Sequence, residues 1–455
     1  MLKTPTITVL GTGYVGLTTA ALCAAAGMKT YVVDPNQSRL DSVKQGRSFF
    51  YEAGLDPIIS DAVTRGMLLP TALYEEAVPQ SDVIISAVGT PDNPDGSSNL
   101  QYVFAAATEA AGLMKPNAIY VQKSTVPVGT GQKVLRIFAD KGIKNTYLSN
   151  PEFLREGTAL ADSLWFDRVV VGGNDAKAVA EVTALYKRIE TARDTIAATG
   201  GVAAPQPLPA STYIHVGLES AEMIKVVSNA FLALKISFAN SIALMADKAG
   251  ADINEVLDAV GADRRIGRAF LSSGRGYGGG CFPKDVSGLI AAGLGMGVDM
   301  EIMQAAQSVN ESMPGYVVKK LQDALGGSLQ GRAVAVLGLA FKAGTSDCRR
   351  SPAVAIANML VNRGATVTAY DPKAAEEAAH MLDKAVTIAS TPEQALQDAH
   401  AVIIATEWPE FTALPAQTFT KHMAGDIIID AMNALDRDML IAANLHYEGI
   451  GRSAA

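Results

Sequence analysis

The sequence predicts an α/β protein in which two doubly wound domains are joined by a domain built on a long helix. Residues 6–35 and 332–372 each read as an apolar strand, a loop containing glycine, a helix, a glycine stop and a second strand ending at aspartate. Between them, residues 220–250 form an apolar run of good helix formers with no proline and no glycine before Gly250. A chain of 455 residues is long enough for two or three such domains.

Composition excludes several classes of protein. Apolar residues make up 49% of the chain and charged residues 18%, which is typical of a compact enzyme. The net charge of −8 argues against a nucleic-acid partner. Cys23, Cys281 and Cys348 show neither metal-ligand spacing nor a disulfide framework, so we expect no metal and a reducing cytoplasm. An early first strand leaves no room for a signal peptide, and no apolar run was expected to reach membrane-spanning length.

The first glycine turn predicts a dinucleotide site in an N-terminal domain, residues 1–205. Gly11, Gly13 and Gly16 stand where such a turn needs a tight bend, close approach to pyrophosphate and close helix–strand packing. The following helix would face the phosphates with free N–H groups and its positive dipole end. Asp34 could accept from both ribose hydroxyls and repel a 2′-phosphate, which favours NAD over NADP. The alternative, a purely structural turn, leaves this aspartate unexplained.

Further candidates follow the next strands. The runs 82–91 and 118–130 break into Thr, Ser, Pro and Gly, and ligands gather at the carboxyl ends of parallel strands. Thr90 and Thr125 lie at these breaks. Glu152 and Glu156 are four residues apart and would share one face if that segment is helical. The alternative is an acidic first turn that faces its own helix dipole.

The central domain, residues 206–312, contains the long helix, preceded by a linker at 198–211. Lys225 and Asn229 are spaced i, i+4 and therefore share a helix face. The apolar stripe on the opposite face is wider than one domain needs to cover. We therefore expect a homodimer or a higher homo-oligomer built on this helix.

The C-terminal domain, residues 313–455, repeats the strand–helix–strand outline without the GxGxxG spacing. Its first loop is longer and carries Lys342, Arg349 and Arg350 where phosphates would lie. This pattern predicts a site for a different nucleotide. The alternative is a structural duplicate with solvated charges on its loop.

The segment "GYGGGCFPKD", residues 276–285, places Cys281 after a run of glycines. Glycines let ligand and backbone approach closely, and their N–H groups can stabilise developing negative charge. Cys281 is thus a candidate nucleophile, with Asp285 four residues on to hold a water and Lys284 between them. The alternative is a buried packing residue, to which we assign Cys23 in its Ala-rich helix.

Six motifs follow one another along nearly the whole chain: "GTGYVGL", "KSTVPVGT", "NPEFLREGTA", "EMIKVVSNAFLALKISFANS", "GYGGGCFPKD" and "GLAFKAGTSDCRRSPA". Together, in this order, they resemble the UDP-glucose/GDP-mannose dehydrogenase family. The resemblance implies a four-electron oxidation of a sugar C6 hydroxyl to a carboxylate, with NAD used twice. It also implies a covalent intermediate on cysteine, first a thiohemiacetal and then a thioester.

The resemblance also assigns roles to residues. Cys281 matches the nucleophile. Lys225 would stabilise the C6 oxyanion or take part in proton transfer, and Asn229 would hold the same oxygen or a water. Asp285, with Thr125, would position or activate the hydrolytic water, and Glu152 and Glu156 would assist near the sugar and the proton path. The implied cofactor residues are Gly11, Gly13, Tyr14, Val15, Gly16, Asp34, Arg39, Thr90, Thr125, Glu156 and Lys284. The implied substrate residues are Glu152, Phe153, Leu154, Lys225, Asn229, Arg265, Tyr277, Gly278, Phe341 and Lys342, of which Arg265 would reach the substrate of the neighbouring subunit.

The identity of the sugar depends on smaller signals. "YEAGL" is similar to the "YEPGL" of enzymes that act on UDP-glucose, with Ala53 in place of the proline, which favours oxidation of UDP-glucose to UDP-glucuronate. Residues 430–433 read Asp-Ala-Met-Asn where the family often has Asp-Gly-Arg-Asn, so either Arg349 or Arg437 replaces the missing cation or the ligand differs. A UDP-N-acetylhexosamine and GDP-mannose are alternative substrates. A two-electron hydroxyacid dehydrogenase and a non-catalytic NAD-sensing scaffold are alternative functions.

Overall fold

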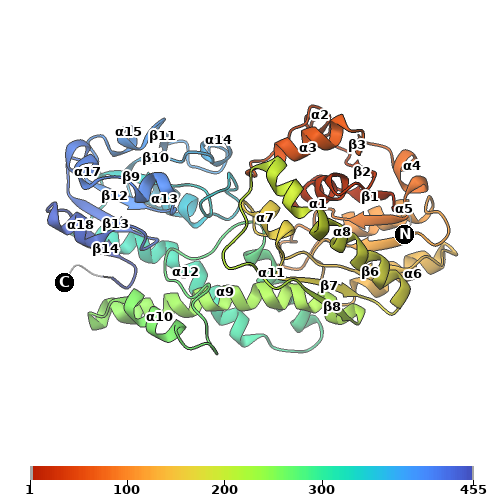
Figure 1. Ribbon diagram of the computed structural model, residues 1–455. Helices are drawn as coiled ribbons and strands as arrows, with labels where there is room; N and C mark the ends of the chain where they lie inside the picture. The colour runs from red at the N-terminus through yellow and green to blue at the C-terminus, as the bar shows by residue number, and fades with distance from the viewer. Residues whose placement is uncertain (1–3, 453–455) are drawn as a thin grey trace. The chain divides into compact units, whose positions relative to one another are not determined.

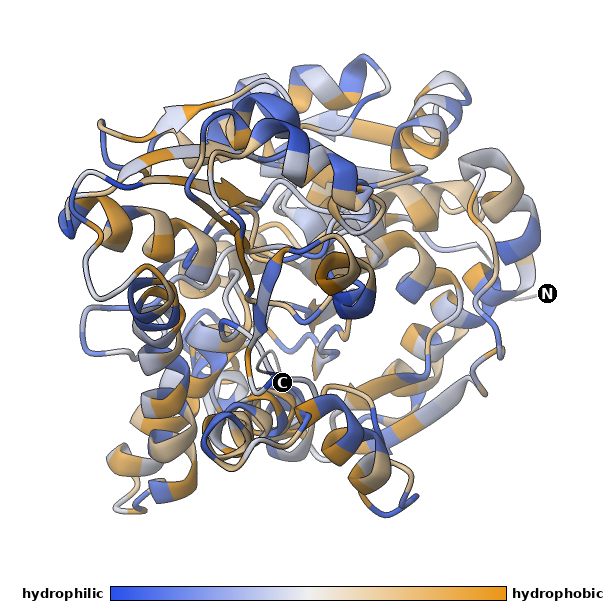
Figure 2. Cartoon of the chain, turned by 90° about the vertical axis from the view of Figure 1, so that its left-hand side faces the viewer, coloured by the Kyte–Doolittle hydropathy of each residue, from blue (hydrophilic) through white to orange (hydrophobic). Residues whose placement is uncertain are grey.

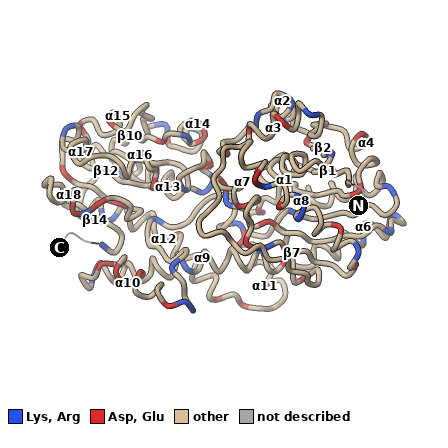
Figure 3. The backbone as a smooth tube through the Cα atoms, in the orientation of Figure 1, with Lys and Arg blue, Asp and Glu red and all other residues tan. Residues whose placement is uncertain are grey.

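The computed structural model describes residues 4–452, and the chain divides into two compact units, Met1–Ser228 and Asn229–Ala455. Each unit contains one sheet covered by helices on both faces, with the elements labelled in Figure 1. This architecture confirms the predicted fold class of two doubly wound α/β parts and a long central helix. Most charged residues lie on helices and loops (Figure 3). Strands β1 Ile7–Leu10, β2 Thr30–Val33, β10 Thr366–Tyr370 and β12 Ala401–Ile404 carry none.

Unit 1 is built on an eight-stranded sheet with the order β3-β2-β1-β4-β5-β6-β7-β8. Neighbouring strands are parallel except for the pair β6–β7. The central strands are buried along their whole length, as expected of a parallel sheet covered on both faces. The strands are β1 Ile7–Leu10, β2 Thr30–Val33, β3 Leu68–Thr71, β4 Val83–Ser86, β5 Ile119–Gln122, β6 Tyr147–Ser149, β7 Arg168–Gly172 and β8 Thr212–Val216.

Two apolar clusters fix the helices of unit 1 on opposite faces of this sheet. One joins the sheet to α1, α3, α7 and α8, and the other joins it to α4, α5 and α6. The helices are α1 Tyr14–Ala25, α2 Gln37–Lys44, α3 Leu55–Thr64, α4 Tyr74–Ala77, the 3₁₀ turn η1 Val78–Gln80, α5 Gln101–Ala111, α6 Thr130–Asp140, α7 Ala159–Leu164 and α8 Ala176–Gly200. Figure 2 shows apolar and polar residues mixed along the helices, as amphipathic covering helices require.

Unit 2 has a six-stranded, fully parallel sheet with the order β11-β10-β9-β12-β13-β14. Its strands are β9 Ala333–Leu337, β10 Thr366–Tyr370, β11 Thr387–Ile388, β12 Ala401–Ile404, β13 Ile427–Asp430 and β14 His446–Gly449. Its helices are α10 Ile253–Gly261, α11 Phe282–Gly295, α12 Glu301–Ala324, α13 Pro352–Asn362, α14 Ala375–Ala378, α15 Pro392–Leu396, α16 Pro409–Thr412, α17 Ala416–His422 and α18 Arg437–Ala442.

The long helix α9, Leu218–Ala249, is confirmed as one continuous element of 32 residues. Its first turns belong to unit 1 and the rest to unit 2. The expectation that no apolar run reaches membrane-spanning length is wrong, because α9 is long and apolar enough by length and composition. The same test is passed by core helices of soluble proteins, and α9 carries the buried charged residues Glu222 and Lys225. Strand β8, just before α9, is not among the elements that the sequence predicted.

Glu222 on α9 closes the N-terminus of α6. Its carboxylate is 2% exposed and accepts hydrogen bonds from the backbone N–H groups of Gly129 and Gly131, each at 2.7 Å. A carboxylate stabilises a helix at this end because it satisfies free N–H groups and faces the positive end of the dipole. Burial raises the pKa of Glu222 to about 6, although both N–H groups act in the opposite direction.

Glu222→Gln is expected to lower the free energy of unfolding by about 1–3 kcal/mol at pH 7, because an amide cannot accept from both N–H groups. The folded-state pKa of Glu222 lies above the unfolded value of 4.5, so its titration favours folding most below pH 4.5 and least above pH 6. The stability gap between wild type and variant should therefore narrow as the pH rises from 4.5 to 6. Urea unfolding across this range measures the gap.

The matched control is Glu219→Gln, since Glu219 is exposed on the same turn of α9 and bonds the side chain of Gln132. Its effect should stay within about 0.5 kcal/mol. Equal losses in the two variants would show that the buried carboxylate does not hold the α6 terminus.

Candidate active site

The glycine turn between β1 and α1 has the geometry of a phosphate-binding loop. Gly11 adopts φ +97°, and a Cβ there would lie 2.8 Å from the carbonyl oxygen of Ala87. A Cβ on Gly16 would overlap the carbonyl oxygen of Gly11, so this position holds helix and strand together. The N-cap residue Gly13 contributes no side-chain cap, which leaves the first N–H groups of α1 for a ligand phosphate. Tyr14 and Val15 form the first turn of this helix.

Asp34 follows β2 and is held beside the glycine turn. Its Oδ2 accepts from the backbone N–H and the hydroxyl of Thr12 at 2.9 and 2.6 Å, and its Oδ1 accepts from the N–H of Asn36 at 2.9 Å. Arg39 approaches Oδ2 at 3.8 Å. A carboxylate has about four acceptor positions, so Asp34 keeps capacity for a ribose hydroxyl. Together, the turn and this carboxylate fit NAD.

The loops after β4 and β5 lie next to each other because these two strands are paired. Thr90 and Thr125 are half-buried in these loops. The hydroxyl of Ser124 donates to the carbonyl oxygen of Val88 at 2.7 Å and links the two loops. Both threonines thus stand at the carboxyl edge of the sheet, as the sequence predicted.

Glu152 and Lys225 form a buried ion pair. Their Oε1 and Nζ atoms are 2.9 Å apart, and the side chains are 6% and 4% exposed. Burial opposes ionisation of Glu152, but Lys225 and the backbone N–H of Leu154 outweigh it and lower the pKa of this carboxyl group. Phe153 follows Glu152 directly in the sequence. The Cζ atom of the Arg168 guanidinium lies 3.9 Å from the centroid of the Phe153 ring. The structure therefore joins two of the predicted residues into one charged unit.

Residues 151–158 form a loop, and α7 begins only at Ala159. The helical arrangement considered for Glu152 and Glu156 is therefore wrong. Glu52, which the sequence analysis missed, holds this loop by accepting from the N–H groups of Gly157 at 2.9 Å and Leu160 at 3.1 Å. Glu52 lies in the segment "YEAGL", and that segment is the feature of the sequence that could have indicated its role.

A second missed group supports the same loop from the sheet side. Lys123, 5% exposed, donates to the hydroxyl of Tyr186 at 2.9 Å. Tyr186 in turn donates to the Oδ1 of Asn150, whose Nδ2 donates to the carbonyl oxygen of Val170 at 2.7 Å. This chain of contacts fixes Asn150, two residues before Glu152.

In unit 2, the candidate nucleophile lies at the start of a helix. Cys281 is the N-cap of α11 and is partly exposed, and its carbonyl oxygen accepts from the N–H of Asp285 at 2.9 Å. The Oδ2 of Asp285 accepts from the Nδ2 of Asn229 at 2.6 Å, and its Oδ1 lies 2.6 Å from the Nζ of Lys284. Cys281 stands at the positive end of the α11 dipole, a place in a helix that favours a thiolate.

The other two cysteines lack this setting. Cys23 and Cys348 are buried, and burial raises the pKa of each thiol, that of Cys23 to about 12. The assignment of Cys23 to packing is confirmed. Among residues 4–452, no group of three His, Cys, Asp or Glu side chains could hold a metal ion.

The glycines before Cys281 pack closely against the loop after β9, and at Gly278 and Gly279 the neighbouring atoms are a backbone oxygen and an aromatic ring. A Cβ on Gly279 would lie 2.8 Å from the ring of Phe341, and a Cβ on Gly280 would lie 2.6 Å from the guanidinium of Arg349. A Cβ on Gly278 would overlap the carbonyl oxygen of Arg350. The N–H of Gly279 donates to the carbonyl oxygen of Arg349 at 2.9 Å. The cysteine segment and the basic loop therefore form one packed body within unit 2.

The remaining predicted residues are distributed around this body. Tyr277 is buried, and Lys342 lies near the ring of Phe341, 5.8 Å from its centroid. Arg349 is bound to Asp347, with its Nη2 2.6 Å from Oδ2. Arg265 is 88% exposed, and among the described residues it bonds only Asp263.

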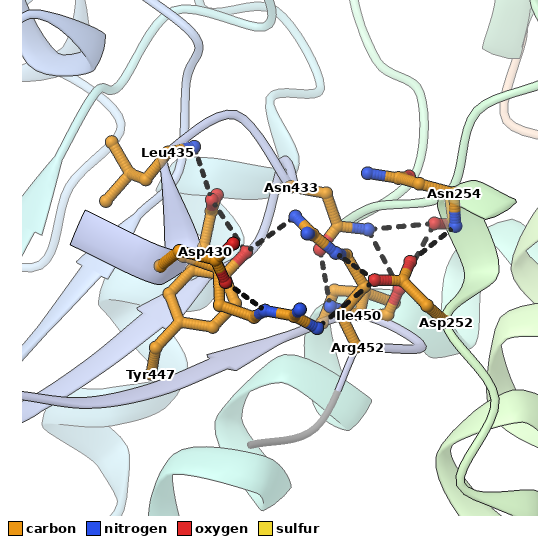
Figure 4. A network of polar contacts seen from close by, with 11 residues as sticks. Asp252, Asn254, Asp430, Asn433, Leu435, Tyr447, Ile450 and Arg452 are labelled. Atoms are coloured by element: carbon orange, nitrogen blue, oxygen red, sulfur yellow. Dashed lines mark hydrogen bonds and ion pairs between the residues drawn. The ribbon is translucent and has the colours of Figure 1, made fainter. Parts of the chain in front are cut away.

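The Asp-Ala-Met-Asn turn at 430–433 belongs to a polar network around the chain end (Figure 4). Buried Asp430 accepts from the N–H of Leu435 at 2.7 Å and from the hydroxyl of Tyr447 at 3.2 Å. Arg437 and Arg452 both bind Asp252, at 3.3 and 3.0 Å. Arg437 is thus committed to a structural ion pair.

Comparison with known proteins agrees with this geometry. Models of the UDP-glucose/GDP-mannose dehydrogenase family match the chain with an NAD binding domain over residues 5–190, a central domain over 219–312 and a UDP binding domain over 335–437. The chain belongs to this family. It is an NAD-dependent nucleotide-sugar dehydrogenase, and the resemblance seen in its motifs is confirmed.

Individual relatives span the whole chain. UDP-glucose 6-dehydrogenase TuaD of Bacillus subtilis is 39% identical over 98% of this chain and 93% of its own, and YwqF of the same organism is 36% identical over 98% of both. The structure of a UDP-glucose dehydrogenase from Pyrobaculum islandicum superimposes with a TM-score of 0.87 at 38% identity, covering 100% of this chain and 99% of the other. A UDP-D-ManNAc dehydrogenase from Pyrococcus horikoshii gives 0.84 at 26% identity, with coverage of 99% and 100%.

Gly279→Ala is expected to destabilise the protein by about 2–4 kcal/mol and to lower turnover. The reason is that φ is +82° at this position and the added methyl group would press on the Phe341 ring. Thermal unfolding and NADH production at saturating substrate measure the two effects.

Gly315→Ala is the control, because Gly315 lies inside α12, where a Cβ meets no atom within 4 Å. That change should be neutral or stabilise by up to about 1 kcal/mol. Full activity and stability in Gly279→Ala would contradict the requirement for close packing.

Proposed function

We propose that this enzyme oxidises UDP-glucose to UDP-glucuronate in the cytoplasm, with Cys281 holding the half-oxidised sugar. The observation that carries the proposal is a partly exposed cysteine at a helix N-cap, presented by glycines that pack on the basic loop of the UDP-binding domain. Full-length relatives named UDP-glucose 6-dehydrogenase at 36–39% identity favour UDP-glucose over other sugars. Structures of dehydrogenases for other UDP-sugars are less similar in sequence, at 26% for the P. horikoshii protein.

The limits 1–205, 206–312 and 313–455 remain our proposed domains for cofactor, catalysis and nucleotide. Each matched family model falls inside one of these three ranges. The models cover residues 5–190, 219–312 and 335–437, so they do not reach every proposed boundary. NAD, when bound at the glycine turn and Asp34, accepts a hydride in each of two oxidation steps.

In the first oxidation, the C6 alcohol loses a proton and a hydride and becomes an aldehyde. We assign Lys225 to the C6 oxygen, since an ammonium group stabilises the developing oxyanion. Glu152, at 2.9 Å from Lys225, pairs with this ammonium group and orients it inside a buried site. Asn229, one helical turn along α9, is assigned to the same oxygen or to a water.

The thiolate of Cys281 then adds to the aldehyde carbon, and protonation of the oxygen gives a thiohemiacetal. Loss of the second hydride and a proton converts it to a thioester. Water attacks the thioester carbon, the C–S bond breaks, the electron pair returns to sulfur, and the carboxylate leaves. Asp285 is placed to position this water, because Asn229 and Lys284 already hold its carboxylate.

The stoichiometry tests the reaction. We expect about two NADH per UDP-glucose consumed, one from each oxidation. Cys281→Ser should lower release of the carboxylate product by at least about 100-fold, because an oxygen ester hydrolyses more slowly than a thioester. NADH absorbance and chromatography of the nucleotide sugars measure both, with Cys23→Ala as the control expected to keep activity.

The substrate panel separates the alternatives. UDP-glucose, UDP-N-acetylhexosamines and GDP-mannose are compared at equal concentration. If another nucleotide sugar is preferred and two NADH are still formed per sugar, the proposed mechanism holds and only the proposed substrate is wrong. One NADH per substrate and an active Cys281→Ser would instead indicate a two-electron dehydrogenase, and no turnover would indicate an NAD-binding scaffold.

We also propose a homodimer formed through α9. Exposed apolar side chains recur along one face of this helix at intervals of four and seven residues, and their exposed fractions run from 44% to 69%. The residues are Met223, Val227, Phe231, Phe238 and Met245. At 100° per residue they fall within a single stripe, which water would contact unless a second copy covers it.

Phe231→Glu combined with Phe238→Glu is expected to shift the dimer to monomer, because two charges would be buried in the interface. Light scattering after size-exclusion chromatography measures the mass. Met381→Glu, at an exposed apolar residue in unit 2, is the control and should leave the mass unchanged.

The assigned role of Arg265 toward the neighbouring subunit can be tested with mixed dimers. Arg265→Ala and Cys281→Ala proteins, each inactive alone, should regain activity when co-expressed, because one site then receives both residues. If Arg265 serves its own subunit, the mixture stays inactive.

A further inference from the structure

Arg275, six residues before Cys281, is a charged residue enclosed in unit 2. Arg275 is 1% exposed, and by volume it is the largest fully buried side chain among the described residues. Burial lowers its pKa to about 10, so the guanidinium remains charged at neutral pH. The negative charges of Glu407 and Asp371 act against the effect of burial, although no salt bridge joins Arg275 to a carboxylate among the described residues. A buried cation without a directly paired carboxylate costs free energy, so a fold that retains one uses its charge or its donors.

The guanidinium of Arg275 joins two loops. Nη2 donates to the carbonyl oxygens of Phe341 at 3.0 Å and Ala340 at 3.3 Å, in the loop after β9. Nη2 also donates to the hydroxyl of Thr406 at 3.3 Å, and Nε donates to the carbonyl oxygen of Ala405, in the loop after β12. Nη1 is buried without a partner.

These two loops occupy a particular place in the sheet. Strands β9 and β12 are neighbours at the point where the strand order reverses, with β10 and β11 on one side and β13 and β14 on the other. Ligands of doubly wound sheets bind at the carboxyl ends of the strands at this switch point. The fork of Arg275 therefore fixes both walls of the place where a nucleotide would bind.

The backbone of the same segment is anchored on each side. The N–H of Arg275 donates to the carbonyl oxygen of Ala431 at 2.9 Å, and the N–H of Gly274 donates to the Oδ1 of Asn240 at 2.7 Å. Asn310 accepts from the N–H of Tyr277 at 2.7 Å and donates to its carbonyl oxygen at 3.0 Å. Displacement of the loops would thus be transmitted through Arg275 to the chain that leads to Cys281.

The two arginines that the sequence suggested as replacements for the family's arginine both carry ion pairs. Arg349 pairs with Asp347, and Arg437 pairs with Asp252. Met432 stands where the family often has arginine, and its Sδ would lie 3.7 Å from a Cβ on Gly274, next to Arg275. The buried charge beside this turn is therefore that of Arg275.

We propose that Arg275 is a positioning residue that couples the nucleotide-binding loops after β9 and β12 to the position of the Cys281 thiol. This inference rests on the proposed function, which places a nucleotide at these loops and a reactive thiol at Cys281. When a nucleotide fixes the positions of these loops, the hydrogen bonds of the Arg275 guanidinium also fix the backbone of residue 275. The six residues that follow then place the sulfur of Cys281.

The test uses UDP as the probe and iodoacetamide as the reporter of the thiol. In the wild type, saturating UDP should change the alkylation rate of Cys281 at least about threefold, with Cys23 and Cys348 protected by burial. In Arg275→Leu, the Kd for UDP and the KM for UDP-glucose should rise at least about tenfold, and saturating UDP should no longer change alkylation. Calorimetry, kinetics and mass spectrometry of the labelled peptide supply these values.

Arg275→Lys keeps the charge but loses the planar fork, so it too should lose the UDP effect on alkylation while retaining part of the affinity. Arg363→Leu, an exposed arginine at the end of α13, is the control and should match the wild type. Should Arg275→Leu fail to fold, Arg275→Lys decides alone. Wild-type affinity together with wild-type UDP response in Arg275→Lys overturns the proposal.

Failure of the proposed function gives a different result. In that case, the wild type itself would not bind UDP, or Cys281→Ser would release carboxylate at the full rate. The wild type could also bind UDP and need Cys281 for activity while its rate of Cys281 alkylation is the same with and without UDP. That result would overturn only the coupling through Arg275.

Discussion

Close packing between the glycines at 278–280 and the loop that contains Phe341 and Arg349 is the constraint on which the rest of unit 2 depends. A single methyl group at any of these glycines would meet a ring, a guanidinium or a backbone oxygen. Because the backbone lies so close, Cys281 has a fixed position relative to the loop of the UDP-binding domain. Helix α11 then begins at the cysteine, and its first turn brings Asp285 to Asn229. Packing thus sets the geometry that the chemistry uses.

Helix α9 organises the polar groups in a second way. Lys225 and Asn229 are one turn apart on it, and each is committed to a buried carboxylate, Glu152 for the lysine and Asp285 for the amide. Buried polar pairs add little net stability, but removal of one partner is costly, so they select a single arrangement. A rotation of α9 would break both pairs together. Each pair therefore fixes the turn of α9 that it contacts within its own unit.

Sequence patterns predicted the fold class, the glycine turn with Asp34, the long helix and the i, i+4 pair on it, because each depends on residues close in sequence. They did not predict Glu52 and Arg275, whose partners lie 105 and 130 residues away and leave no local signature. A charged residue in a glycine-rich loop is usually solvated, so nothing in the sequence around Arg275 predicts its burial. The helical option for Glu152 and Glu156 was wrong because Glu52 holds the segment as a loop. Between Lys225 and Asp247, helix α9 carries a single charged residue, Lys235, and this long apolar stretch makes the helix long enough for a membrane span by length and composition.

The two sheets also show how one architecture came to hold different ligands. Asp371 follows β10 as Asp34 follows β2, but Asp371 accepts from five protein donors, including the N–H groups of Leu339 and Ala340 and the indole N–H of Trp408 at 3.1 Å. Four acceptor positions are then already filled, and none is left for a ribose. Asp34 accepts from three donors and keeps that capacity. The protein donors to Asp371, among them the indole of the buried Trp408, thus take the place that a ribose has at Asp34, although both sheets have a doubly wound strand order. The switch point of the second sheet is left to another nucleotide.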